Sequence, residues 1–169
     1  MLRGQDFTAD GSMPSFRTSR VVGHAPGEMF DLVADVESYP QFVPLCKALR
    51  LLRRTTDAKG IETLIAEMQI GYKAIKETFT SRVTLDRQRQ KILVEYVDGP
   101  FKTLENRWTF RGHPEADPAP HSCTVDFFIT YEFKNRALAL LVGSMFDAVF
   151  RKMASAFVAR ADAVYGVPR

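Results

Sequence analysis

The C-terminal segment from Lys134 to Tyr165 limits the fold more than any other stretch, because it carries the longest helical pattern in the chain. The apolar residues that share one side of this helix are Leu138, Val142, Met145, Phe146, Val149, Phe150, Met153 and Phe157. Asn135 can cap its start and Gly166 can end it. We therefore expect one amphipathic helix about 40 Å long, broad enough on its apolar side to cover a sheet.

Between Ala48 and Phe133 the sequence period changes from that of a helix to that of a strand. Alternating apolar and polar residues begin near Leu49, Leu64, Ile75, Ile92, Leu104 and Cys123, and an earlier strand runs from Ser15 to Val22. Pro26 opens a helical corner after that first strand. The pattern predicts an α+β helix-grip fold, in which a curved antiparallel sheet of about seven strands surrounds the long helix, with two short helices after the first strand.

The chain has the length of one domain. Residues 1–12 are polar and show neither period, so we interpret them as a disordered leader. Residues 13–167 are expected to form a single domain.

Composition and charge exclude several classes of protein. Hydrophobic residues make up 46% of the chain and charged residues 25%, as in ordinary globular proteins. The net charge of +3 is too small to predict DNA binding, although basic residues gather at 47–54 and 82–91 and leave a weakly basic face as an alternative. Two cysteines, no signal peptide and no long apolar run indicate a cytoplasmic location. The three scattered histidines give a metal site no support.

A sheet curled around one helix often leaves an internal gap, and the inward positions here are aromatic or aliphatic. A fully packed core remains the alternative. The residues expected to line a ligand cavity are Met68, Ile70, Tyr72, Phe79, Ile92, Val94, Tyr96, Asn106, Trp108, Phe110, Phe127, Ile129, Met145, Phe146, Val149, Phe150 and Met153. Phe42, Val43 and Leu45 are expected at its mouth, where an exposed apolar corner can touch a membrane surface transiently.

Polar residues at inward positions are few. Asn106 shares the parity of Trp108, so its side chain can bind a ligand headgroup or, as the favoured alternative, the nearby backbone. The hydroxyl groups of Tyr72 and Tyr96 also need partners. No nucleophile–base spacing, phosphate loop or metal motif occurs, so we assign no catalytic residue.

Three runs of sequence resemble one known family. They are MFDLVADVESYPQFVP at 29–44, DGPFKTLENRWTF at 98–110, and the C-terminal pair YEFKNRALALLV and FVARADAVYG. Together they resemble the coenzyme Q-binding and ribosome-association-toxin branch of the START-like superfamily of polyketide cyclases and lipid-transport proteins. Leu45 departs from the Trp or Gly that precedes the cysteine in many relatives, which leaves the identity of the ligand open.

The resemblance implies a function that composition alone does not. It implies non-catalytic binding of ubiquinone or another prenyl lipid, without covalent attachment, in support of respiratory electron transport or ubiquinone biosynthesis. Together with the apolar corner at Phe42, Val43 and Leu45, such a ligand leads us to expect peripheral contact with the inner membrane during lipid loading. A toxin-like protein that binds a ribosomal subunit and blocks subunit association is the first alternative. An aromatase/cyclase-type enzyme is the second.

Overall fold

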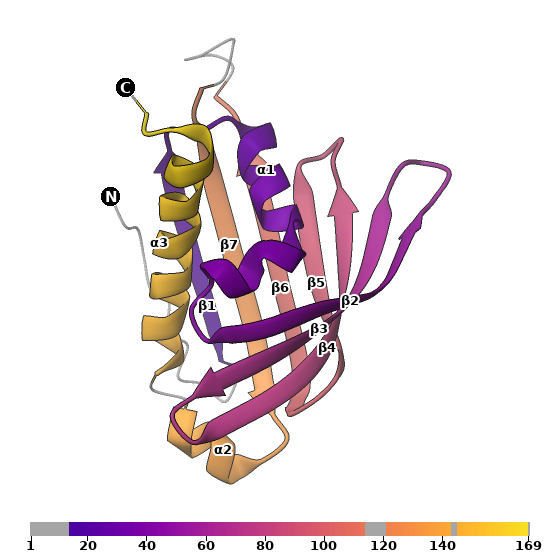
Figure 1. Cartoon of the computed structure of the whole chain (residues 1–169), viewed down its shortest axis with the longest axis vertical. Coiled ribbons are helices and arrows are strands. Elements are labelled where there is room, and N and C mark those ends of the chain that lie inside the picture. Colours follow the sequence, from indigo (N-terminus) through magenta and orange to yellow (C-terminus); the bar gives the residue numbers. More distant parts are fainter. Residues whose placement is uncertain (1–13, 114–120, 143–144, 169) are drawn as a thin grey trace.

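The computed structural model describes residues 14–113, 121–142 and 145–168. The expected leader at 1–12 lies outside these ranges. The described residues form a seven-stranded sheet in the order β1-β7-β6-β5-β4-β3-β2. Figure 1 shows this sheet curling around the C-terminal helix, with both short helical elements on the same concave side. The predicted helix-grip class and the antiparallel sheet are confirmed.

The strands follow the alternating stretches of the sequence closely. Their bounds are β1 Ser15–Val22, β2 Cys46–Thr56, β3 Glu62–Tyr72, β4 Ile75–Asp86, β5 Lys91–Asp98, β6 Phe101–Arg111 and β7 Cys123–Phe133. From β2 to β7 each strand pairs with the next one along the chain, whereas β1 pairs with β7. The turn before β6 requires glycine, because Gly99 has φ 140° and an added Cβ would lie 2.6 Å from Phe79 Cβ.

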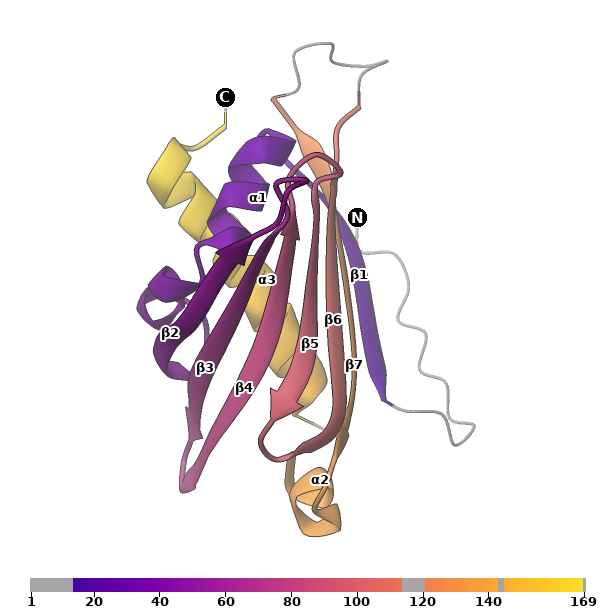
Figure 2. The same cartoon turned by 90° about the vertical axis from the view of Figure 1, so that its right-hand side faces the viewer.

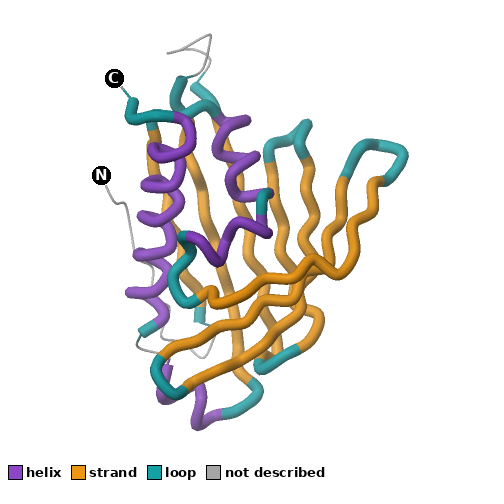
Figure 3. Tube along the Cα trace, viewed as in Figure 1, coloured by secondary structure: helices purple, strands orange, loops and turns teal. Residues whose placement is uncertain are grey.

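The helices divide into two groups (Figure 3). After β1 come α1 at Pro26–Ala34 and the 3₁₀ helix η1 at Val36–Gln41, which together are the predicted corner. After β7 come the short helix α2 at Arg136–Val142 and the long helix α3 at Phe146–Tyr165. Asn135 Oδ1 accepts a hydrogen bond of 2.8 Å from the backbone N–H of Ala137, so the predicted cap exists.

The prediction of one uninterrupted helix over 134–165 was wrong in extent. The structure describes two helices, and Figure 2 shows α2 below the sheet while α3 crosses its concave face. The sequence between them contains Gly143, whose helix propensity is about 1 kcal/mol poorer than that of alanine. The spacing of the apolar residues, from which one helix was predicted, does not take the glycine into account. The long apolar stripe therefore divides into a covering helix and a separate helix of seven residues.

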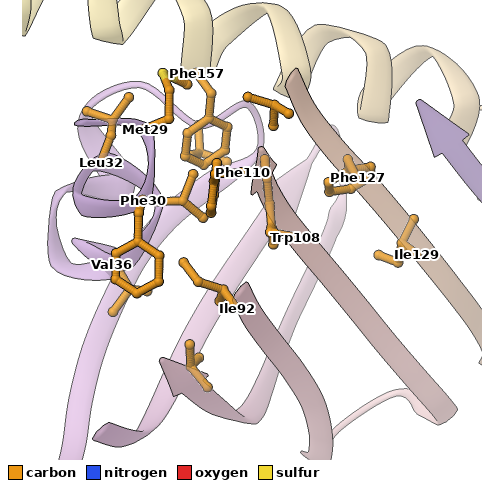
Figure 4. Close-up of a cluster of buried hydrophobic side chains, with 14 of the residues drawn as sticks. Met29, Phe30, Leu32, Val36, Ile92, Trp108, Phe110, Phe127, Ile129 and Phe157 are labelled. Carbon is orange, nitrogen blue, oxygen red and sulfur yellow. The ribbon is translucent and has the colours of Figure 1, made fainter. Parts of the chain in front are cut away.

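The densely packed part of the core lies beneath α1 and the C-terminal half of α3. Figure 4 shows Phe30 and Phe110 meeting there, with Trp108 and Phe157 beside them. The ring centroids of Phe30 and Phe110 are 6.0 Å apart, and those of Trp108 and Phe157 are 5.1 Å apart. Edge-to-face contacts of this kind stabilise a core beyond the area that they bury. The cavity described below begins at Trp108 and Phe157 and extends toward Phe146, at the other end of α3.

Candidate ligand-binding cavity

A cavity of about 180 Å³ lies between the concave face of the sheet, the first turns of α3 and the segment from η1 to β2. Its walls are almost entirely apolar because each central strand turns its aliphatic and aromatic side chains to this face. Of the residues expected to line a cavity, it brings together Met68, Ile70, Phe79, Ile92, Val94, Asn106, Trp108, Ile129, Phe146, Val149, Phe150 and Met153, with Val43 and Leu45 from the expected mouth.

A smaller pocket of about 50 Å³ adjoins this cavity at the end of the molecule where α2 lies. Tyr72 and Met145 line the smaller pocket and not the larger one. The residues shared by both pockets are Leu45, Ile70, Phe101, Phe146 and Val149. These shared walls make the smaller pocket an outward extension of the cavity.

Two of the expected lining residues belong to packed core instead. Phe110 packs under α1 against Phe30. The ring of Phe127 lies 6.0 Å from that of Phe16 and 4.7 Å from that of Trp108, which fills the space between β7 and α3. Strand parity placed both correctly on the concave face, but parity does not say how far along the strand the cavity extends.

Tyr96 and Phe42 also lie outside the lining. The Tyr96 hydroxyl donates a 2.6 Å hydrogen bond to the Gly99 carbonyl oxygen, which holds the β5–β6 turn. The Phe42 ring packs edge-on against Phe157 at 5.1 Å, and the guanidinium of Arg160 lies 5.3 Å from the Phe42 ring centre. The corner expected to be exposed is therefore largely covered, and Val43 beside it is buried.

Several lining residues were missed by the sequence analysis. They are Val36, Tyr39, Pro44, Cys46, Leu49, Ala66, Ser81, Val83, Phe101, Leu104, Tyr131 and Phe157. Five of them, Ala66, Ser81, Val83, Leu104 and Tyr131, share the parity of predicted residues on the same strand, so a complete parity list would have included these five. Those from η1 and the loop after it carry no periodic signal, and only the tertiary structure brings them to the cavity.

Asn106 is buried in the cavity wall, but both of its polar atoms are engaged. Its Nδ2 donates to the carbonyl oxygen of Phe128 at 2.9 Å, and its Oδ1 accepts a 2.8 Å hydrogen bond from the indole N–H of Trp108. This geometry corresponds to the favoured alternative, a structural role. The amide fixes the orientation of the Trp108 ring within the wall.

The side-chain hydroxyl groups of Ser81 and Tyr131, unlike the amide of Asn106, are available to a ligand in the cavity. Both side chains are buried and line the cavity. Neither hydroxyl takes part in a hydrogen bond given for the described residues, and neither is a fully enclosed unpaired atom, so both oxygens border the cavity space. Burial, with the nearby Asp147 carboxylate as a smaller cause, raises the pKa of Tyr131 to about 12. Its hydroxyl therefore keeps its proton at neutral pH and can donate a hydrogen bond into the cavity.

The junction of the two pockets has an unusual backbone. Leu45 has φ 67°, a left-handed conformation that most residues avoid, and its carbonyl oxygen accepts a 3.0 Å hydrogen bond from the Gly71 N–H. Cys46 follows it with a buried thiol, whose pKa burial raises to about 11. The thiol is thus protonated and a poor nucleophile at neutral pH.

The described part of the chain offers no cluster of three His, Cys, Asp or Glu side chains that could hold a metal ion. None of the helices in those ranges combines the length and apolar character needed to cross a bilayer. The cavity's chemistry thus consists of apolar walls, two hydroxyl donors, an engaged amide and a protonated thiol. Such a set suits binding of a largely apolar molecule with a few hydrogen-bond acceptors.

Comparison with known proteins identifies the family. A family model described as polyketide cyclase / dehydrase and lipid transport matches residues 22–158. The chain belongs to this family. Ribosome association toxin RatA of Escherichia coli strain K12 is 34% identical over 153 residues, which cover 90% of this chain and 90% of that protein. Coenzyme Q-binding protein COQ10 homolog B, mitochondrial, of Xenopus laevis is 32% identical over 152 residues, 89% of this chain and 59% of that protein.

A solved structure from the same family gives the same picture of the fold. The solution structure of an 18 kDa protein from Caulobacter crescentus is 31% identical to this chain, with a TM-score of 0.73, and the match covers 92% of this chain and all of that one (100%). The resemblance inferred from the three sequence runs is therefore confirmed.

Proposed function

We propose that this protein binds a prenylated quinone, ubiquinone first among them, in its internal cavity without transforming it. In this role it supports respiratory electron transport or ubiquinone biosynthesis. The observation that carries the proposal is an apolar cavity whose only free polar groups, among the described residues, are the hydroxyls of Ser81 and Tyr131. The relative named as a coenzyme Q-binding protein supports the same ligand class.

The size and polarity of the cavity favour a quinone ring over a charged headgroup. A cavity of about 150 Å³ holds a benzene molecule, so about 180 Å³ suits one substituted ring and not a whole isoprenoid chain. The ring carbonyls of a quinone only accept hydrogen bonds, and the two free hydroxyls can donate them. The isoprenoid tail would leave through the smaller pocket, whose walls continue those of the cavity.

The cavity's titratable groups favour binding over catalysis. Burial raises the pKa values of Tyr39, Cys46 and Tyr131, so none of them titrates near neutral pH. General acid–base catalysis works best with a pKa close to the working pH. The one carboxylate lining either pocket, within the described ranges, is Glu77, which belongs to the outer pocket. An aromatase/cyclase-type activity is therefore the weaker candidate.

A ribosome-directed role is the second candidate, because the RatA relative matches over nearly the whole chain. Most arginines of the basic clusters noted in the sequence pair with carboxylates. Arg50 Nη2 lies 3.2 Å from Glu67 Oε1, Arg89 Nη1 lies 3.5 Å from Asp86 Oδ2, and Arg87 pairs with Asp31. Phosphate binding would have to compete with these pairs. Co-sedimentation with ribosomal subunits at low salt tests this role directly.

The test of the quinone proposal uses native mass spectrometry of protein purified from its own host and of ligand-free protein mixed with ubiquinone. We expect one quinone per chain and quenching of fluorescence from Trp108, the only tryptophan in the sequence, which lines the cavity. Val94→Trp fills the cavity and should abolish occupancy. Leu93→Trp, at the neighbouring position of opposite parity on β5, is the matched control and should retain it.

The proposal fails if ligand-free protein takes up no ubiquinone at saturating concentration. It also fails if Val94→Trp, shown to be folded by its cooperative thermal transition, binds as well as the wild type. Sedimentation of an empty protein with ribosomal subunits would then favour the second candidate.

A further inference from the structure

One end of the molecule gathers the features of a membrane-docking surface. Figures 1 and 2 both show α2, the β3–β4 turn and the β5–β6 turn at this end. The smaller pocket lies among them, lined by Leu138 of α2, Tyr72 and Ile75 of the hairpin, and Pro100 of the other turn. The cavity therefore approaches the surface at the place where these three elements meet.

Lysines surround this opening. Lys47, Lys73 and Lys76 line a surface groove of about 440 Å³ that shares Ile70, Tyr72 and Glu77 with the smaller pocket. All three lysines are exposed, and among the described residues none has a carboxylate within ion-pair distance. Glu77 is the groove's one carboxylate, so cations are in excess there.

The backbone of the β3–β4 hairpin positions two of these lysines. Lys73 has φ 51°, the left-handed conformation of a tight turn, and its Nζ lies 5.3 Å from the centre of the Tyr72 ring. The Lys47 side chain lies across the backbone of Gly71, where an added Cβ would come within 2.9 Å of Lys47 Cγ. Three positive charges, one on β2, one in the β3–β4 turn and one on β4, thus line one groove beside the opening.

An apolar side chain completes the surface. Leu140 of α2 is 81% exposed, the largest fraction given for any large apolar residue in the described ranges. Its neighbour Leu138 lines the smaller pocket, and the exposed cations Lys134 and Arg136 precede it. An exposed leucine beside several cations is typical of a segment that lies in the headgroup region of an anionic bilayer.

We propose that this end, comprising α2 and the groove of Lys47, Lys73 and Lys76, docks on the surface of an anionic phospholipid bilayer. Leu140 enters the boundary between headgroups and acyl chains, the lysines contact lipid phosphates, and the smaller pocket faces the membrane. The proposal deepens and rests on the proposed function, since a membrane lipid then reaches the cavity without crossing water. A nucleic acid would use the lysines but gain little from Leu140.

The test is co-sedimentation of the full chain with phosphatidylcholine vesicles prepared with or without phosphatidylglycerol, and free of quinone. We expect binding to the anionic vesicles only, and weakening of it by salt. Because each lysine near an anionic surface contributes about fivefold to binding, changing Lys47, Lys73 and Lys76 together to Gln should lower it about a hundredfold. Leu140→Ser should also weaken it.

The matched control changes the same number of charges elsewhere. Arg53→Gln, Lys59→Gln and Lys91→Gln together remove three exposed cations from the outer sheet face and the opposite end of the sheet. This variant should bind anionic vesicles nearly as well as the wild type. Equal losses in both triple variants would overturn the proposal, because binding would then follow net charge and not this surface.

A second measurement separates failure of docking from failure of the proposed function. Quinone binding in detergent solution requires the cavity but no bilayer. The variant with Lys47, Lys73 and Lys76 changed to Gln, and the Leu140→Ser variant, should therefore bind quinone in detergent like the wild type. Normal quinone binding without vesicle binding overturns docking alone. Vesicle binding without quinone binding overturns the proposed function. A third outcome is that the wild type binds no vesicles but sediments with ribosomal subunits, and that the triple Gln variant loses this sedimentation. That outcome overturns docking in favour of a ribosomal partner.

Discussion

Replacing Tyr131 by Phe removes one oxygen atom from the cavity wall and little else. The Tyr131 ring packs against Phe146 at 4.9 Å and Phe133 at 5.8 Å, and a phenylalanine can keep these contacts. The hydroxyl has no protein partner within the described ranges, so its removal breaks no hydrogen bond of the ligand-free protein. The substitution therefore isolates what the hydroxyl does for a ligand.

The expected effects on binding and on stability have opposite signs. A neutral hydrogen bond to a quinone carbonyl contributes about 0.5–1.5 kcal/mol, so its loss should raise the Kd about 2- to 12-fold. Among the described residues the one fully enclosed side-chain atom without a partner is Gln90 Oε1, so the Tyr131 hydroxyl borders cavity space, where a water can satisfy it at little cost. The free energy of unfolding of the ligand-free variant should thus be unchanged or higher by about 1 kcal/mol.

Quenching of Trp108 fluorescence by a short-chain ubiquinone measures the Kd, and urea unfolding measures stability. Tyr96→Phe is the matched control, because its hydroxyl bonds to Gly99 outside the lining. It should lose about 1 kcal/mol of stability and keep the wild-type Kd. An isoprenoid hydrocarbon without carbonyl groups should bind both variants like the wild type. An unchanged quinone Kd in Tyr131→Phe, with lowered stability, would refute the assigned role.

Two further predictions concern the stability of the fold. Burial raises the pKa values of the Cys46 and Cys123 thiols to about 11, so the unfolded chain loses these protons first as pH rises. The free energy of unfolding should therefore fall between about pH 9 and 11, and a flat urea-unfolding profile over that range would contradict this. His24 is buried and donates from Nε2 to Asp162 Oδ1 at 2.7 Å, joining the loop after β1 to α3. His24→Ala should lower the free energy of unfolding by about 1–3 kcal/mol, measured by urea unfolding, and no loss would show that the bond contributes nothing.

Strand periodicity predicted the sheet well, because each strand has one apolar face and successive strands pair in sequence. The same reasoning placed Val94 and Ile129 correctly on the concave face, and the structure brings both to the cavity. It could not separate them from Phe110 and Phe127, which have the same parity. Whether a part of the concave face is packed or borders a cavity depends on how the helices lie over it. The residue pattern of a single strand carries no information about that packing.

Polar residues were the hardest part to predict from sequence. Asn106 stood out as an amide among apolar residues. Its partners, however, are the indole of Trp108 two residues further along β6 and the carbonyl oxygen of Phe128 on β7, and the second contact depends on how β6 and β7 pair. Tyr131 did not stand out, because tyrosines in strands are common and most find a partner. Whether a buried hydroxyl is satisfied is a property of its surroundings in three dimensions.

The position of β1 has a consequence for the order in which the protein folds. β1 is an edge strand whose one neighbour is β7, and the Ser19–Asp126 hydrogen bond joins residues 107 positions apart. Strands β2 to β7 can pair one after another as the ribosome synthesises them, but β1 must wait until β7 has been made. Closure of a loop of this length is slow compared with hairpin formation. The first strand to be synthesised is thus expected to be the last to join the sheet.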